Sequence, residues 1–159
     1  MVGKFAIAGA SAAIIALSPA AFAQETGGTA DEAKAMLLRA VAAVKADRAK
    51  ALEMFNKGEG GFRDRDLYVF CANASDGTIV ATGNPKLKEA LGMDMRAGQN
   101  STGEPFGAEM YAAIQKPEGQ ISEVSYMATK PTGDDTPVAK VALLTRADDE
   151  IGCGVGYYK

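Results

Sequence analysis

Six side chains with polar tips are candidates for binding a small molecule in this chain of 159 residues. They are three tyrosines and three cations: Tyr68, Tyr111, Tyr126, Arg96, Lys140 and Arg146. Aromatic faces exclude water and an arginine can bind a carboxylate through two hydrogen bonds, so such a set suits a metabolite that bears a carboxylate or an amine. Each residue also has a structural interpretation, because strand tyrosines often pack in a core with a bonded hydroxyl and single cations are often solvated.

The composition excludes much catalytic chemistry. The chain has no His, which removes imidazole bases, Ser-His-Asp and Cys-His nucleophile pairs and His-ligated iron or haem. Two Cys cannot complete a four-cysteine zinc or iron–sulfur site, and no spacing isolates an Asp or Glu pair for acid–base work. The formal net charge of −3 lacks the excess of positive charge typical of nucleic-acid binders. We expect neither an enzyme nor a protein with a metal or cofactor.

Two local patterns have a chemical and a structural interpretation. The acidic runs at 134–135 and 148–150 contain clustered carboxylates, which bind calcium in some proteins, but neither has the spacing of a calcium loop, so solvated turns are favoured. Gly152, Gly154 and Gly156 alternate along the last predicted strand and leave one face bare for close approach, either by the long helix or by a ligand. Helix packing is the favoured explanation. No helix follows, so these glycines do not form a phosphate-binding loop.

The first 23 residues have the layout of a secretory signal peptide. One Lys precedes an apolar run at 5–17, and Ala21-Phe22-Ala23 offers a cleavage site. The run is shorter than the roughly 20 residues that span a bilayer, and no later segment approaches that length. We therefore expect cleavage after Ala23, a flexible leader at 24–30, a periplasmic or secreted location, and no membrane span in the mature chain.

The rest of the chain alternates helical and strand patterns. Apolar residues at three- and four-residue steps predict one long amphipathic helix over 31–56, opened by a Thr29–Glu32 capping box and ended by Gly58. Short helices are expected at 86–91 and 105–116. Strands are expected at 66–73, 78–82, 121–129, 138–146 and 151–158. These elements predict an α+β fold, a five-stranded antiparallel sheet with the long helix on one face and the short helices on the other.

Five stretches of this chain, taken in order, resemble the single Cache domain family. They are GFRDRDLYVF (61–70), DGTIVA (76–81), NPKL (84–87), GEPF followed by Glu109-Met110 (103–110), and GCGVGYYK (152–159). The resemblance spans about residues 31–159 and implies one extracytoplasmic sensor domain with a PAS-like sheet. It also implies a pocket between the sheet and the short helices for a small organic metabolite. A stand-alone secreted member would pass its signal to a membrane receptor, a kinase or a transporter.

The chain departs from the family near the implied pocket. Members often have His-Pro where this chain has Thr82-Gly83, and a hairpin with Trp-Pro where it has 126–131. The fold is therefore expected to carry over better than the ligand. The alternative function is a non-catalytic structural or protein-interaction module whose pocket is filled by side chains, which deeply packed Tyr68, Tyr111 and Tyr126 without a cavity would favour.

The resemblance also bears on the two cysteines. PAS-like sheets place the first and last strands side by side, which favours a cross-strand disulfide between Cys71 and Cys153 in an oxidising compartment. The alternative is a pair of buried free thiols that act as small apolar side chains.

Overall fold

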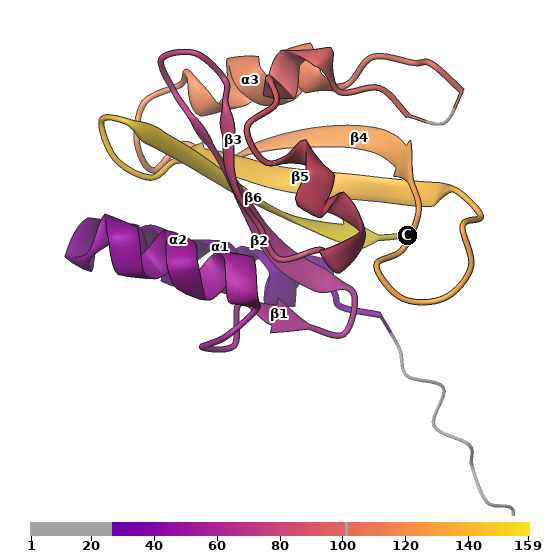
Figure 1. Cartoon of the computed structure of the whole chain (residues 1–159), viewed down its shortest axis with the longest axis horizontal. Helices are drawn as coiled ribbons and strands as arrows, with labels where there is room; N and C mark the ends of the chain where they lie inside the picture. The colour runs from indigo at the N-terminus through magenta and orange to yellow at the C-terminus, as the bar shows by residue number, and fades with distance from the viewer. Residues whose placement is uncertain (1–26, 101) are drawn as a thin grey trace, which may run out of the picture.

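The fold consists of a central antiparallel sheet with helices on both faces, seen edge-on in Figure 1. A computed structural model describes residues 27–100 and 102–159, so the predicted signal peptide at 1–23 and the start of the predicted leader lie outside the described residues. The predicted α+β fold is confirmed. No helix within the described ranges has the length and apolarity needed to span a membrane.

The first helical region consists of two helices, α1 (Ala30–Ala46) and α2 (Arg48–Lys57), rather than the single helix predicted. Thr29 and Glu32 form the predicted capping box, and Gly58 ends α2 in the left-handed conformation with φ 70°. The break falls at Asp47, whose backbone is extended and whose carboxylate accepts a hydrogen bond from the backbone N–H of Lys50. An aspartate satisfies the free amides of a new helix, so it allows the chain to turn where the apolar pattern alone predicts continuity.

Six strands form the sheet, and antiparallel pairing gives them the order β1-β2-β6-β5-β4, with β3 paired to β2. Their bounds are β1 Arg63–Asp64, β2 Leu67–Asn73, β3 Ile79–Thr82, β4 Ser122–Ala128, β5 Val138–Arg146 and β6 Ile151–Tyr158. Five match the predicted strands within three residues at each end. The sixth, β1, has two residues and pairs with the start of β2, in a charged stretch where no strand was predicted.

One face of the sheet packs against α1 and α2. Alternation sends Val69 and Cys71 of β2, together with Cys153 and Val155 of β6, into this core, which they share with Leu37 of α1. The pairing of β2 with β6 places Cys71 opposite Cys153, and a disulfide joins them. The cross-strand pair implied by the family resemblance is therefore present in the fold.

The opposite face carries three short helices. They are the 3₁₀ helices η1 (Pro85–Ala90) and η2 (Met95–Ala97) and the α-helix α3 (Gly107–Ile114). The bare glycines of β6 lie on this side. A Cβ added to Gly152 would lie 2.3 Å from the Cβ of Ile114, so a helix packs directly on the sheet there, but it is the short helix α3 and not the long N-terminal helix that was expected.

The other two β6 glycines are covered by side chains instead of a helix. The ring of Phe70 lies over Gly154, and the stem of Lys140 lies over Gly156. These side chains come from the two strands that flank β6. The glycines therefore allow Phe70 and Lys140 to lie flat across the sheet, which shapes the space above it.

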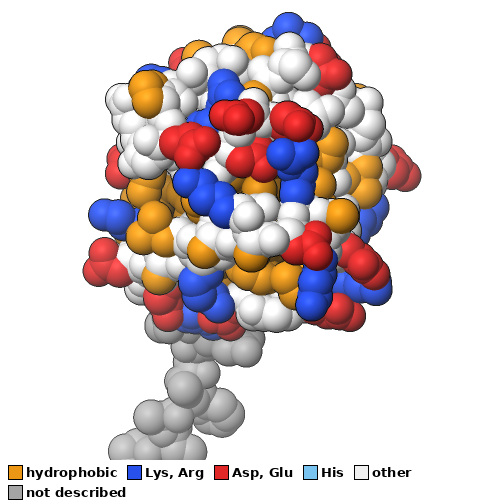
Figure 2. Space-filling model, turned by 90° about the vertical axis from the view of Figure 1, so that its left-hand side faces the viewer, with side chains coloured by type: hydrophobic (Ala, Val, Ile, Leu, Met, Phe, Trp, Pro, Cys, Tyr) orange, Lys and Arg blue, Asp and Glu red, His pale blue; other side chains and the backbone are white. Residues whose placement is uncertain are grey.

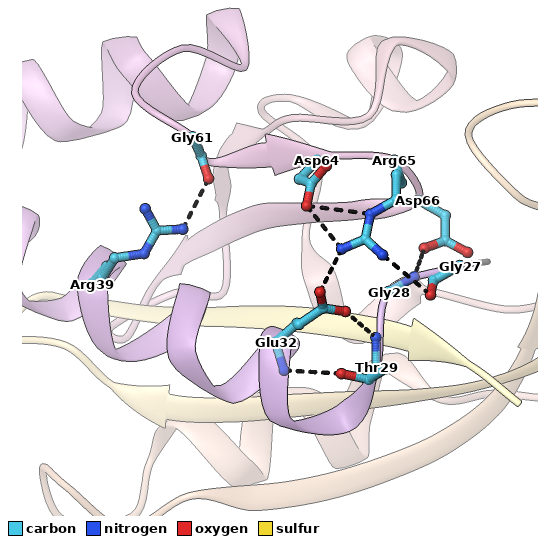
Figure 3. A network of polar contacts seen from close by, with 9 residues as sticks. All are labelled: Gly27, Gly28, Thr29, Glu32, Arg39, Gly61, Asp64, Arg65 and Asp66. Carbon is cyan, nitrogen blue, oxygen red and sulfur yellow. Dashed lines mark hydrogen bonds and ion pairs between the residues drawn. The ribbon is translucent and has the colours of Figure 1, made fainter. Parts of the chain in front are cut away.

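The beginning of the described chain is fastened to the sheet by a polar network (Figure 3). The buried carboxylate of Asp66 accepts a hydrogen bond of 2.6 Å from the backbone N–H of Gly28, and the guanidinium of Arg65 forms ion pairs with Asp64 and Glu32. Gly28, within the leader expected to be flexible, is thus held in place. Asp64, Arg65 and Asp66 of the alternating charge run thus hold the start of the domain against the sheet.

The surface mixes charges of both signs. Figure 2, viewed from the left of Figure 1, shows acidic and basic side chains interspersed with hydrophobic ones and no extended field of one sign. Arg48 of α2 forms ion pairs with Asp148 and Glu150 in the turn between β5 and β6. The carboxylate of Asp148 also accepts hydrogen bonds from two backbone amides of that turn, so the acidic run at 148–150 is part of a structured turn.

Candidate ligand-binding cavity

A cavity of about 390 Å³ lies between the sheet and the short helices on the α3 side. This volume falls in the lower part of the range of small-molecule sites, roughly 300 to 1,000 Å³. Its lining has three parts: a floor of Tyr68, Phe70, Ile79, Thr82, Tyr126, Met127, Ala128 and Thr129; a wall of Asn84, Leu87, Ala90, Met93, Asp94, Met95, Ala97, Gly98, Gln99 and Asn100; and Phe106 with Met110.

The walls that face the sheet consist of short helices and turns rather than long elements. Asn84 caps η1 by accepting a hydrogen bond from the backbone N–H of Lys86, and Asp94 caps η2 by accepting one from Arg96. Between them Gly92 takes φ 84°. A single 3₁₀ turn has few internal hydrogen bonds. The wall over 85–100 is held by these caps and by backbone hydrogen bonds to β3, from the N–H of Gly92 to the oxygen of Ile79 and from the N–H of Ile79 to the oxygen of Met93.

Lys140 is buried beneath the tyrosines of the floor, with 1% of its surface exposed. Its Nζ donates a hydrogen bond of 2.8 Å to the Tyr68 hydroxyl and lies 4.2 Å from the centre of that ring. The Tyr158 ring is 4.7 Å from the same nitrogen and the Tyr126 ring 6.0 Å. Within the described chain no carboxylate forms an ion pair with this ammonium. Its compensation comes from one hydroxyl and three aromatic faces.

The floor tyrosines have hydroxyl protons to donate. Burial raises the pKa of Tyr126 well above its usual value of about 10, so this phenol is protonated at neutral pH. Its ring stacks on Phe106 with centroids 4.4 Å apart, and its hydroxyl has no hydrogen-bond partner among residues 27–100 and 102–159. The Tyr68 hydroxyl accepts from Lys140, which leaves its own proton for another acceptor. The floor therefore presents these two donors, together with the side chains of Thr82 and Thr129, beside a mostly apolar surface.

The other candidate cations are engaged outside the cavity. The guanidinium of Arg96 stacks over Tyr111, 5.0 Å from the ring centre, and binds Asp94, which lowers the pKa of that carboxylate. Arg146 donates to the backbone oxygen of Ile114 at 2.6 Å and so fastens the end of α3 to β5. Among the residues that line the cavity in the described chain, Asp94 is the one that carries a charge.

The structure thus divides the six predicted ligand-binding residues into two groups. Tyr68 and Tyr126 line the cavity, and Lys140 lies against both of them. Tyr111, whose hydroxyl donates to the backbone oxygens of Ala74 and Ser75, lies outside the lining together with Arg96 and Arg146.

Most of the wall was missed by sequence reasoning. Met93, Met95 and Met110 all line the cavity, yet methionines at loop and helix positions resemble ordinary core residues in sequence. The best available signal lay in the two departures from the family pattern, because Thr82 and the segment starting at Tyr126 both contribute to the floor.

The described residues offer no group of three or more acidic or cysteine side chains arranged to hold a metal ion. The acidic run at 134–135 forms a local turn, in which the Asp134 carboxylate accepts a hydrogen bond from the backbone N–H of Thr136. This contact lowers the pKa of Asp134.

Comparison with solved structures finds similar folds among chemotaxis proteins. A methyl-accepting chemotaxis protein from Vibrio parahaemolyticus RIMD 2210633 superimposes with a TM-score of 0.60 and 20% sequence identity, over 80% of this chain and 86% of that one. A periplasmic sensor domain of a chemotaxis protein gives a TM-score of 0.57 and 19% identity, over 80% and 88%. At these identities the likeness establishes the fold alone.

Sequence comparisons give no further assignment. No protein-family model matches the chain, and no curated protein matches it.

Proposed function

We propose that the mature chain is an extracytoplasmic sensor module of the single Cache type. It binds a small organic molecule, and the ligand-bound state is recognised by a separate receptor, kinase or transporter. The observation that carries the proposal is the cavity of about 390 Å³ above the sheet. Its position, between a PAS-like sheet and short helices, is the position implied for the family's pocket. The shared fold with two chemotaxis sensor structures supports the same proposal.

The signal would arise from closure of the wall over the ligand. The segment 85–100 is the part of the lining built from turns and 3₁₀ helices, whereas the floor is built from paired strands. A ligand that contacts wall and floor together stabilises the closed arrangement and shifts an existing equilibrium toward it.

A polar path connects the floor to the beginning of the domain. Thr129 lines the cavity, and the next residue, Lys130, has its Nζ 3.6 Å from the buried carboxylate of Asp66. Asp66 in turn holds the backbone of Gly28. A shift of the floor on binding would therefore reach the N-terminal edge of the domain, where a partner could detect it.

The alternative is a structural or interaction module with a filled pocket. That function was expected if Tyr68, Tyr111 and Tyr126 packed together without a cavity. Tyr68 and Tyr126 instead border a cavity, and Tyr111 lies outside its lining. The observation favours ligand binding over the structural alternative.

Thermal denaturation with a mixed library of amino acids, organic acids and amines tests the proposal. A compound present at about 100 times its Kd stabilises the folded state by about 2.7 kcal/mol, which raises the Tm of a domain of this size by several degrees. We expect at least one such shift, and expect Ala128→Phe to abolish it by filling the floor of the cavity.

The matched control is Ala139→Phe. Ala139 pairs with Met127 on the neighbouring strand but is exposed and lies outside the lining, so the same substitution there should leave the shift intact. A library that leaves the Tm unchanged at millimolar concentrations would refute the binding function and favour the structural alternative.

A further inference from the structure

The lining of the cavity restricts the charge of any ligand. Asp94, the charged residue of the lining, has both carboxylate oxygens bound to Arg96, at 2.9 Å from Nε and 2.7 Å from the terminal nitrogen. Burying a charged group without a partner of opposite sign is strongly unfavourable. A zwitterionic amino acid, a dicarboxylate or a polyamine would therefore bring at least one charge that the described lining does not compensate.

Most of the surface available to a ligand is apolar. Phe70, Phe106 and Ile79 contribute to it, together with three flexible methionines, Met93, Met95 and Met110. Methionine adapts its shape to varied apolar partners. These side chains suit the body of an apolar molecule rather than a small polar metabolite.

The apolar surface continues out of the cavity to its rim. Leu87 and Met93 line the cavity and are 45% and 55% exposed, and they are two of the five most exposed large apolar side chains of the described residues. Exposed apolar groups gathered at one opening indicate that something apolar covers them. A ligand whose body extends to the rim would do so.

One part of the floor can bind the polar head group of a ligand. The hydroxyls of Tyr68 and Tyr126 each have a proton to donate, and Lys140 stands behind both rings. The hydrogen bond from the ammonium of Lys140 polarises the Tyr68 hydroxyl and strengthens it as a donor. An oxygen acceptor, either a carboxylate or a carbonyl, fits this place, and a single negative charge there would lie near the buried ammonium.

We propose that the ligand is an amphipathic molecule with an apolar body and one oxygen-acceptor head, the body lying along the methionine and phenylalanine walls and the head at the Tyr68–Tyr126–Lys140 floor. This inference rests on the proposed binding function and narrows it to one chemical class.

Calorimetric titration with acetate, butanoate, hexanoate and octanoate tests the apolar body. Each added methylene that enters the cavity should tighten binding about fourfold, until the cavity is full. Succinate and glutamate should bind more weakly than octanoate, and Ala128→Phe should abolish octanoate binding while Ala139→Phe preserves it.

Octanamide and two variants test the head. Lys140→Met should weaken octanoate binding about tenfold or more and octanamide binding much less, because only the carboxylate gains from the buried charge. Lys86→Met is the matched control, because that lysine is bound to Asp135 on the surface. Tyr126→Phe removes a hydroxyl without an intramolecular partner, so the fold should persist while both ligands bind several-fold more weakly.

The outcomes distinguish failure of the amphipathic ligand class from failure of the proposed sensor function. If a polar library compound binds in a manner blocked by Ala128→Phe, while affinity for the acids does not depend on chain length, the sensor function stands and the amphipathic class is refuted. Octanoate binding that survives Ala128→Phe would also refute the class, because it would place the acid outside the cavity. Absence of binding by every compound, polar or apolar, would refute both.

Discussion

Reduction of the Cys71–Cys153 disulfide should lower the stability of the domain by a predictable amount. The two cysteines are 82 positions apart, and the loop they close contains every strand between β2 and β6. In the chain-entropy description a loop of this length stabilises the folded state by at most about 4.5 kcal/mol, and removal of native disulfides is usually worth about 2 to 5 kcal/mol. Because domains are stable by about 5 to 15 kcal/mol, the reduced protein should fold but be much easier to unfold.

Urea denaturation followed by circular dichroism measures this difference. If the free energy of unfolding falls by about 2 kcal/mol for each molar of urea, a loss of about 3 to 4 kcal/mol of stability lowers the urea midpoint by about 1.5 to 2 M. The protein should be reduced in denaturant and refolded with reductant, because both sulfurs are buried, with their residues at 0% and 1% exposure.

The double variant C71A/C153A provides the comparison. Reduced wild type loses the cross-link and keeps both sulfurs in the core, whereas the variant loses the cross-link and the packing, so it should be less stable again by about 1 kcal/mol. Oxidised and reduced wild type with the same urea midpoint would refute the reasoning, because the disulfide would then contribute nothing by restricting the unfolded chain.

Three further predictions concern packing, the N-terminal anchor and pH. Gly152→Ala should lower the urea midpoint by an amount equivalent to about 1 to 3 kcal/mol, because the new Cβ would clash with α3 at 2.3 Å; an unchanged midpoint would contradict this close packing. Asp66→Ala should destabilise by a similar amount and speed hydrogen exchange at the amide of Gly28, since that amide loses its acceptor, and unchanged exchange would refute the anchor. Burial raises the pKa of Tyr126 and Tyr158 above the unfolded value of about 10, so the stability they contribute is complete below pH 10 and declines as the pH rises above it; urea midpoints that hold steady to about pH 11 would contradict this.

The sequence predicts the elements well where the spacing of the apolar residues agrees with the positions of the cap and turn residues. The capping box at Thr29, the left-handed Gly58 and the five main strands follow from local patterns that tertiary contacts reinforce. The break at Asp47 was missed because the apolar period continues through it, and only the extended backbone reveals that the carboxylate caps a second helix. The two-residue strand β1 has no periodicity to detect.

The candidate cavity was only partly predictable. Tyr68, Tyr126 and Lys140 alternate onto the α3 side of three strands, and this alternation can be seen in the sequence. The engagement of Arg96 by Asp94, and of Arg146 by the backbone of α3, depends on chain segments that meet only in the folded molecule. Residue type therefore identified groups able to bind a ligand, but not which of them remain available to one.

The coupling between cavity and N-terminal edge can be tested with the same variants. If the path through Lys130 and Asp66 carries the signal, ligand binding should slow hydrogen exchange at Gly28 in the wild-type protein and leave it unaffected in Asp66→Ala. Binding that protects Gly28 equally in both proteins would exclude this path.

The methionine methyl groups provide the most direct measurement of whether a small molecule enters the cavity. Met93, Met95 and Met110 line it, whereas Met36 and Met54 pack in the core on the other face of the sheet. A carbon–proton spectrum of methyl-labelled protein, titrated with octanoate and then with the mixed metabolite library, should show shifts of these three cavity signals while the signals of Met36 and Met54 stay in place. Shifts confined to Met36 and Met54, or a spectrum unchanged by every compound, would contradict the account.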